Sequence, residues 1–95
     1  MATIQSKKFD EEHGVFGFEW TEEMKVCIKY DKKQKAIVVS SNRDGYKMLA
    51  QIFLSLSEID PDKEYFHMHL DARAEKWYGD LEPGSDDIIL EVLKK

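Results

Sequence analysis

The sequence predicts an α+β fold in two layers, a mostly antiparallel sheet of about five strands with one helix packed on one face. Several short segments alternate apolar and polar residues with a period of two, which is typical of half-buried strands. One segment between them repeats apolar residues every three or four positions, as an amphipathic helix does. The chain has 95 residues and no linker rich in proline, glycine and serine, so we expect one domain, residues 1–95.

Three strands are expected before the helix. Residues 1–13 are polar apart from Phe9, and we expect a flexible arm or an edge segment there. Aromatic residues alternate with small or charged ones over residues 16–20, which predicts the first strand. Residues 24–30 show the same alternation, and residues 35–40 contain a β-branched run after a charged turn. A hairpin is the simplest connection between these two segments.

The helix is predicted over residues 42–57. Ser41, followed three residues later by Asp44, resembles a capping box at its start. Residues 59–62 end it, because the residue before Pro61 is pushed out of the helical region. The apolar stripe expected to face the sheet comprises Tyr46, Leu49, Ala50, Ile52, Phe53, Leu56 and Ile59.

Two further strands are expected over residues 65–71 and 87–93, which gives the order β-β-β-α-β-β. In the first of them, His67, His69 and Asp71 share the face opposite to the apolar residues. A single helix covers only one face of the sheet, so the second face should be open or engaged with a partner. The connection over residues 72–85 contains Trp77 and Tyr78, which either close the end of the core or anchor a partner.

Charge and cysteine content limit the function. The chain has 14 Lys and Arg against 19 Asp and Glu, a net charge of -5, which disfavours binding to nucleic acid or an anionic membrane. The same charge would steer a basic protein partner towards the molecule. A single cysteine, Cys27, cannot form an intramolecular disulfide and indicates a reducing compartment. No signal peptide or membrane span is predicted, so we expect a cytoplasmic protein.

Metal binding and catalysis have weak support in the sequence. His67 and His69 lie two apart on one strand face and could hold one ion, but Asp71 would lie roughly 13 Å from His67 in an extended strand. Cys27 lies between Lys25 and Lys29 on one predicted face, yet a lone strand cysteine is usually an ordinary half-buried residue. We therefore predict no catalytic residue, no metal and no cofactor. A metal-binding protein using the His-x-His-x-Asp strand stays open as an alternative.

A family resemblance adds to this interpretation. The helix SNRDGYKMLAQIFLSLSE, the strand YFHMHLD and the tail LEPGSDDIILEVLKK occur in that order over residues 41–95. They resemble the small immunity proteins of bacterial polymorphic toxin systems, specifically the family numbered thirty-two. The residues that carry the resemblance are Gly45, His67, His69, Asp71, Glu82, Gly84 and Ser85. The strands predicted before the helix match nothing in the resemblance.

The resemblance implies an inhibitor without catalytic activity that binds and neutralises a cognate protein toxin in the producing cell. A basic nuclease would be one toxin that suits the net charge of -5. The expected contact surface is the open sheet face and the adjacent loop, with His67, His69, Asp71, Trp77 and Tyr78 as the partner-binding residues. A homodimer formed through an uncovered sheet face or edge is the remaining alternative.

Overall fold

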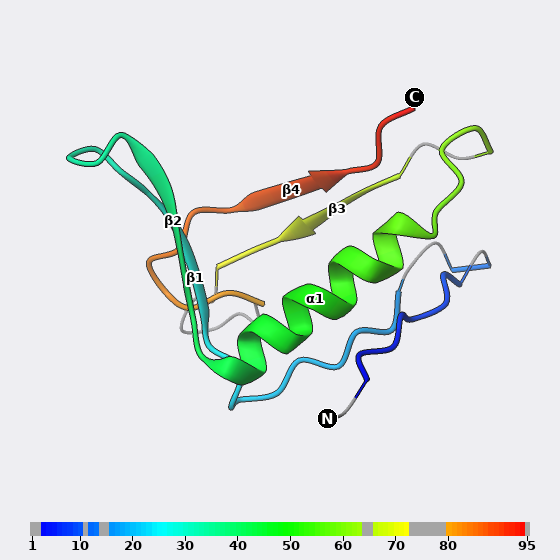
Figure 1. The fold of residues 1–95 in the computed structure, drawn as a ribbon, viewed down its shortest axis with the longest axis horizontal. Coiled ribbons are helices and arrows are strands. Elements are labelled where there is room, and N and C mark those ends of the chain that lie inside the picture. The colour runs from blue at the N-terminus through cyan, green and yellow to red at the C-terminus, as the bar shows by residue number, and fades with distance from the viewer. Residues whose placement is uncertain (1–2, 11, 14–15, 64–65, 73–79, 95) are drawn as a thin grey trace.

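The computed structural model describes residues 3–10, 12–13, 16–63, 66–72 and 80–94. Its elements, in chain order, are β1 (Val26–Asp31), β2 (Ala36–Ser41), α1 (Arg43–Ser57), β3 (His67–Leu70) and β4 (Ile88–Glu91). The first two strands form an antiparallel hairpin, and β3 pairs antiparallel with β4 as a separate two-stranded sheet. In Figure 1, α1 runs along the β3–β4 pair, and the hairpin lies across the end where the helix begins. The α+β class is confirmed, whereas the single sheet of about five strands is wrong.

The hairpin does not join the other sheet because residues 82–86 occupy its free edge. The Glu82 N–H donates to the Val26 carbonyl at 2.7 Å, on the side of β1 away from β2. The Ser85 hydroxyl donates to the Ile28 carbonyl at 2.9 Å and accepts from the Ile28 N–H at 3.0 Å. Pro83 lies within this segment and has no N–H to contribute to a ladder. The chain therefore leaves β1 before it forms β4, and the two strand pairs stay separate.

Residues 16–20 are extended but form no strand, so the first predicted strand is wrong. The alternation itself is confirmed, because Phe16, Phe18 and Trp20 are half-buried whereas the residues between them are exposed. Phe16 packs edge-on against Phe66, with ring centroids 5.4 Å apart, and lies 5.1 Å from Phe18. Phe9 contacts both Phe16 and Phe66 at centroid distances of 5.2 Å. In residues 16–20, the period of two therefore reflects the packing of one face and not pairing of the backbone with another strand.

The helix α1 begins one residue later than the predicted capping box. Asn42 is its N-cap, and the Asn42 Oδ1 accepts from the Gly45 N–H at 2.8 Å, while Ser41 is the last residue of β2. The buried side of the helix is also rotated relative to the prediction. Tyr46 and Phe53 are 49% and 54% exposed, although both were expected to face the sheet. The buried helical positions are Gly45, Met48, Leu49, Ile52, Ser55 and Leu56.

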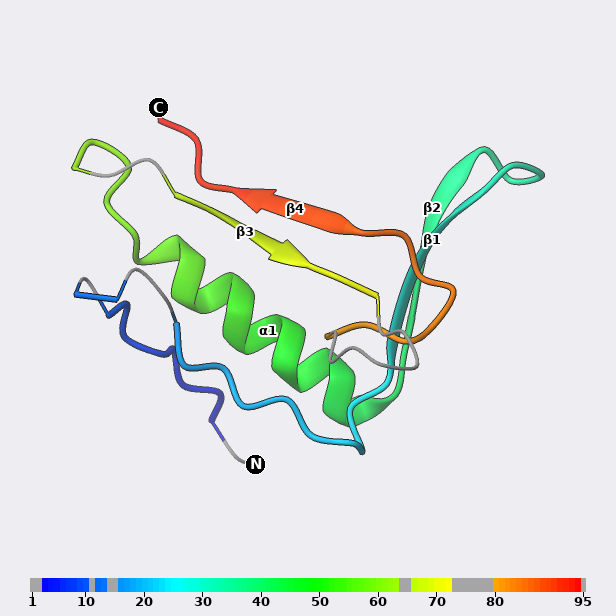
Figure 2. The same ribbon diagram turned by 180° about the vertical axis from the view of Figure 1, so that it is seen from behind.

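The core lies between α1 and the strands, with a covering layer from the N-terminal segment. Its buried apolar residues are Val26, Ile28, Met48, Leu49, Ile52, Leu56, Phe66, Leu70 and Leu81. The N-terminal segment follows the side of α1 away from β3 and β4 (Figure 2). The Lys7 N–H donates to the Ser55 hydroxyl at 2.8 Å, and the Gln51 side chain donates to the Gln5 carbonyl at 3.0 Å. These bonds hold the segment beside the helix and satisfy the buried Ser55 hydroxyl.

Candidate protein-binding site

The outer face of the β3–β4 pair carries the predicted histidines. His67 and His69 are exposed, and their rings meet edge to face with centroids 5.3 Å apart. On β4, Glu91 lies opposite His67 and Ile89 lies opposite His69 in the antiparallel register. Ile89 is 56% exposed, which is high for an isoleucine in a strand. This face presents an imidazole pair, one carboxylate and one apolar side chain to the surroundings.

Asp71 lies at the end of β3 and is half-buried. Its carbonyl oxygen accepts from the N–H groups of Asp80 and Leu81 at 2.9 and 3.0 Å, so its backbone anchors the returning chain. Next to it, Ala72 and Leu81 form a parallel bridge. Trp77 and Tyr78 lie outside the described residues. The structure therefore places three of the five predicted contact residues.

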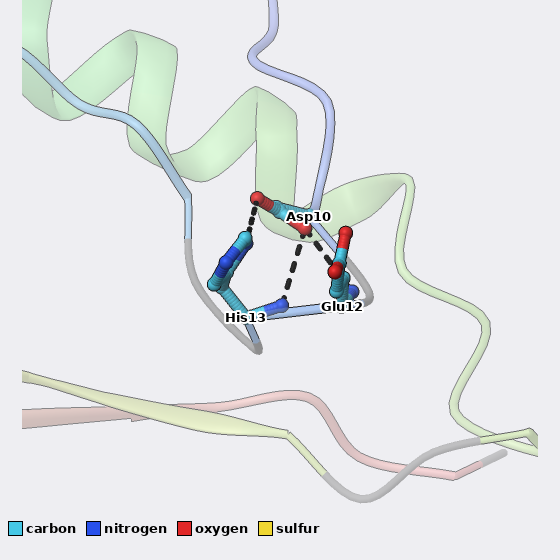
Figure 3. A group of neighbouring side chains, drawn as sticks. All are labelled: Asp10, Glu12 and His13. Carbon is cyan, nitrogen blue, oxygen red and sulfur yellow. Dashed lines mark hydrogen bonds and ion pairs between the residues drawn. The ribbon is translucent and has the colours of Figure 1, made fainter.

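Among the described residues, a different group gathers potential metal ligands. Asp10, Glu12 and His13 bring one ligand atom each within 4.8 Å of one another, and this group includes none of His67, His69 or Asp71 (Figure 3). All three side chains are exposed. The Asp10 carboxylate accepts from the Glu12 and His13 N–H groups at 3.1 and 3.2 Å and contacts the His13 ring nitrogen at 2.8 Å. The bond with His13 lowers the pKa of Asp10. A local Asx turn accounts for this cluster.

Cys27 is partly exposed on the face of the hairpin that points away from the core. Ser40 is its cross-strand partner, and Lys29 pairs with Val38 next to them. These residues line a shallow hollow of about 450 Å³ that also reaches Lys32. The hollow is lined by polar, charged and aliphatic side chains, and the expectation of an ordinary strand cysteine stays a prediction.

Four residues that carry the family resemblance have packing or backbone roles in the structure. Gly45 lies in the first turn of α1 against β1, where a Cβ atom would lie 2.7 Å from the Val26 side chain. Gly84 has a φ of 89°, a left-handed conformation that glycine adopts without strain. Ser85 joins residues 82–86 to β1, as described above, and the Glu82 carboxylate lies 3.8 Å from the Lys25 amine. Gly45 lets the helix approach β1, and Glu82 and Ser85 attach the chain before β4 to β1, while Gly84 is exposed in the turn between them.

An apolar groove opens between the hairpin, α1 and β4, and the sequence did not predict it. We define the hairpin groove by Val39, Tyr46, Phe53, Ile88 and Leu90, which line a cavity of about 390 Å³. The Tyr46 hydroxyl donates to the Val39 carbonyl at 3.2 Å and fixes the ring across β2. The sequence feature that could have indicated the groove is the pair Tyr46 and Phe53, two aromatic residues seven positions apart at the edge of the helical apolar stripe.

Comparison with known proteins identifies a family. The family model described as immunity protein 32 matches residues 36–93, which is more than half of the chain. The matched region starts at β2 and includes α1, β3 and β4. Neither a curated protein nor a solved structure matches the chain. Within the described residues, no helix is long and apolar enough to span a bilayer. From its match across β2, α1, β3 and β4, the chain belongs to the immunity protein 32 family.

Proposed function

We propose that this protein is the immunity partner of a bacterial toxin, which it binds and neutralises in the cytoplasm of the producing cell. The observation that carries the proposal is the family match over residues 36–93. Neutralisation needs no reaction by the inhibitor, because a protein bound over a toxin's active site excludes the substrate. We therefore assign the protein no catalytic step and no cofactor.

The outer face of β3 and β4 is one candidate contact surface. The His67 and His69 rings offer hydrogen-bonding nitrogens, and Ile89 offers apolar area beside them. A stable complex buries about 800 Å² on each partner, so a toxin seated here would also reach the end of β3 at Asp71. Trp77 and Tyr78 complete this proposed surface on the basis of the sequence.

The net charge of -5 supports a toxin that is basic overall, such as a nuclease that binds phosphate backbones. Opposite net charges raise the association rate, which matters for an inhibitor that must capture a toxin before it acts. The association rate of the wild-type complex should therefore fall as salt is added.

A rescue assay tests the proposed function. The toxin domain encoded beside this gene is expressed in a test bacterium with and without the protein, and survivors are counted. We expect killing that co-expression relieves. The double variant His67→Ala/His69→Ala tests the contact surface, and His13→Ala is its matched control because His13 is exposed on the N-terminal segment. A toxin that kills equally well in the presence of the wild-type protein would refute the immunity function.

A further inference from the structure

The hairpin groove continues into an apolar surface that extends beyond the core. Side chains two apart on β1 share one face, and the cross-strand pairs Ile28 with Val39 and Tyr30 with Ile37 lie on it. Exposure rises along this face, from 8% for Ile28 to 51% for Tyr30 and 67% for Ile37. The apolar face of the hairpin therefore extends beyond the helix, and the turn is the end of the hairpin that lies away from α1 (Figure 1).

The helical side of the groove is equally uncovered. Phe53 is 54% exposed and Tyr46 49%, and Val39 on the opposite wall is 42% exposed. Exposed apolar side chains are ordinary when they are scattered, but these line one continuous cavity. A concave apolar surface with aromatic walls is typical of a site that receives side chains from a partner.

The rim of the groove is positively charged. With about 100° between successive helical residues, Arg43 and Lys47 flank the solvent side of the row formed by Tyr46 and Phe53. Asp44 falls about 160° away from Tyr46 by the same spacing, on another side of the helix. At the far end, the hairpin turn carries the exposed lysines Lys32, Lys33 and Lys35.

The acidic groups near the hairpin are bound to backbone donors. The Asp31 carboxylate accepts from the N–H groups of Lys33 and Gln34 at 2.9 and 3.3 Å. The Asp86 carboxylate accepts from the Tyr30 N–H at 3.0 Å. Five basic side chains at the helical edge and the turn end of the groove outnumber these two carboxylates, in a protein whose net charge is -5.

We propose that the toxin docks in the hairpin groove, through a segment that carries apolar side chains flanked by carboxylates. The apolar side chains fill the cavity between Phe53 and Val39, and the carboxylates pair with Arg43, Lys47 and the lysines of the hairpin turn. This inference rests on the proposed function and adds the docking surface and the chemistry of its occupant. Net charge steers the toxin as a whole, whereas this local complementarity fixes its orientation.

A second copy of the chain fits this surface less well. A two-fold dimer brings the same patch of each copy together, so groove against groove would place two cationic rims side by side. Like charges at an interface suppress association. An apolar segment with acidic flanks satisfies both the cavity and the rim.

The test measures the affinity of the purified full-length protein for the toxin domain encoded beside its gene. Phe53→Asp in the groove and Ile37→Ser on the apolar face that continues from it should each weaken binding, by at least about 30-fold for Phe53→Asp, which removes an aromatic wall of the cavity. Both side chains are more than half exposed, so thermal melts should remain close to that of the wild type.

A charge-matched pair of variants tests the rim. Arg43→Glu/Lys47→Glu should weaken binding by about tenfold or more, because both local ion pairs with the toxin segment become repulsive. Lys63→Glu/Lys94→Glu changes the net charge equally at exposed positions away from the groove, and should change affinity by less than about threefold.

The outcomes separate this inference from the proposed function. If the wild-type protein neither binds the toxin domain nor rescues cells, the proposed function fails and the inference with it. If it binds with unchanged affinity after the groove substitutions, the groove assignment is overturned and the immunity function stands. A wild-type dimer that Phe53→Asp dissociates, with toxin binding intact, would assign the groove to a second copy and also overturn the inference.

Discussion

Replacing Gly45 with alanine tests the contact between α1 and β1. In the first turn of the helix, an added Cβ would lie 2.7 Å from the Val26 Cγ2 atom and 3.0 Å from the Lys25 carbonyl oxygen, and against the Ser41 hydroxyl. The Ser41 side chain can rotate away. The Lys25 carbonyl belongs to the backbone and Val26 is fully buried, so neither moves without shifting β1 relative to the helix.

Two opposing terms decide the sign of the effect. Alanine is the better helix former and would gain at most about 1 kcal/mol over glycine. Overpacking a tight site costs about 1–3 kcal/mol, and here the obstructing atoms include backbone. We expect Gly45→Ala to lower the free energy of unfolding by about 1–2 kcal/mol, because the steric term exceeds the propensity term. For a domain of this size, that is a fall in Tm of roughly 4–16 °C.

Urea and thermal unfolding, followed by circular dichroism, measure this effect. Gly17→Ala is the matched control, since a Cβ at this exposed residue meets no atom within 4 Å. The control should be unchanged or more stable by up to about 1 kcal/mol. A Gly45→Ala protein as stable as the wild type would refute the close approach of α1 to β1.

Three further changes test other parts of the fold. Ser85→Ala removes the hydroxyl that serves both backbone groups of Ile28 and should cost about 1–2 kcal/mol of unfolding free energy, whereas Ser57→Ala on the exposed side of α1 should stay within about 0.5 kcal/mol. Asn42→Ala removes the N-cap acceptor and should cost about 1–2 kcal/mol in urea unfolding; a loss no larger than that of Ser57→Ala would contradict the capping role. Hydrogen bonds from the Gln34 side chain and from the Gln34 and Lys33 N–H groups lower the pKa of Asp31. The stability that these bonds give is therefore present above the pKa of Asp31 in the unfolded chain, and it is lost as the pH falls through the pKa of Asp31 in the folded protein. Nuclear magnetic resonance titration should show Asp31 below the ordinary aspartate pKa with both turn amides shifting in parallel, and an ordinary value would disprove these bonds.

Periodicity predicted which side chains face the core better than it predicted which backbones pair. The alternation is confirmed by burial over β3, β4 and the first half of β1, whereas Tyr30 in the second half of β1 is exposed; residues 16–20 alternate in the same way without being part of a strand. A period of two reports that one face of an extended chain is packed, and that is equally true of a strand and of an extended segment beside aromatic rings. The two sheets are separate because residues 82–86 form hydrogen bonds with β1. The bonded groups are far apart in the sequence, so local periodicity does not predict them.

The candidate sites were predictable to different degrees. The outward direction of His67 and His69 follows from strand alternation alone. The exposure of Tyr46 and Phe53 does not, because spacings of three and four place them on the apolar stripe whether or not something covers its edge. Their exposure depends on the space between the hairpin, α1 and β4, which is a property of the tertiary structure.

Gly45 and Ser85 support the fold, whereas we propose a binding role for the residues of the hairpin groove. Gly45 lets α1 approach β1, and Ser85 attaches the chain before β4 to the same strand. Both contacts join elements that line the groove, because Ile28 of β1, α1 and β4 all contribute to its walls. Substitutions at Gly45 or Ser85 should therefore lower stability first, and affinity only through it. Substitutions at Phe53 or Ile37 should lower affinity in a protein that still unfolds at the wild-type temperature. If Phe53→Asp lowered both in proportion, Phe53 would be part of the core despite its exposure, and the groove would be a packing defect with no binding role.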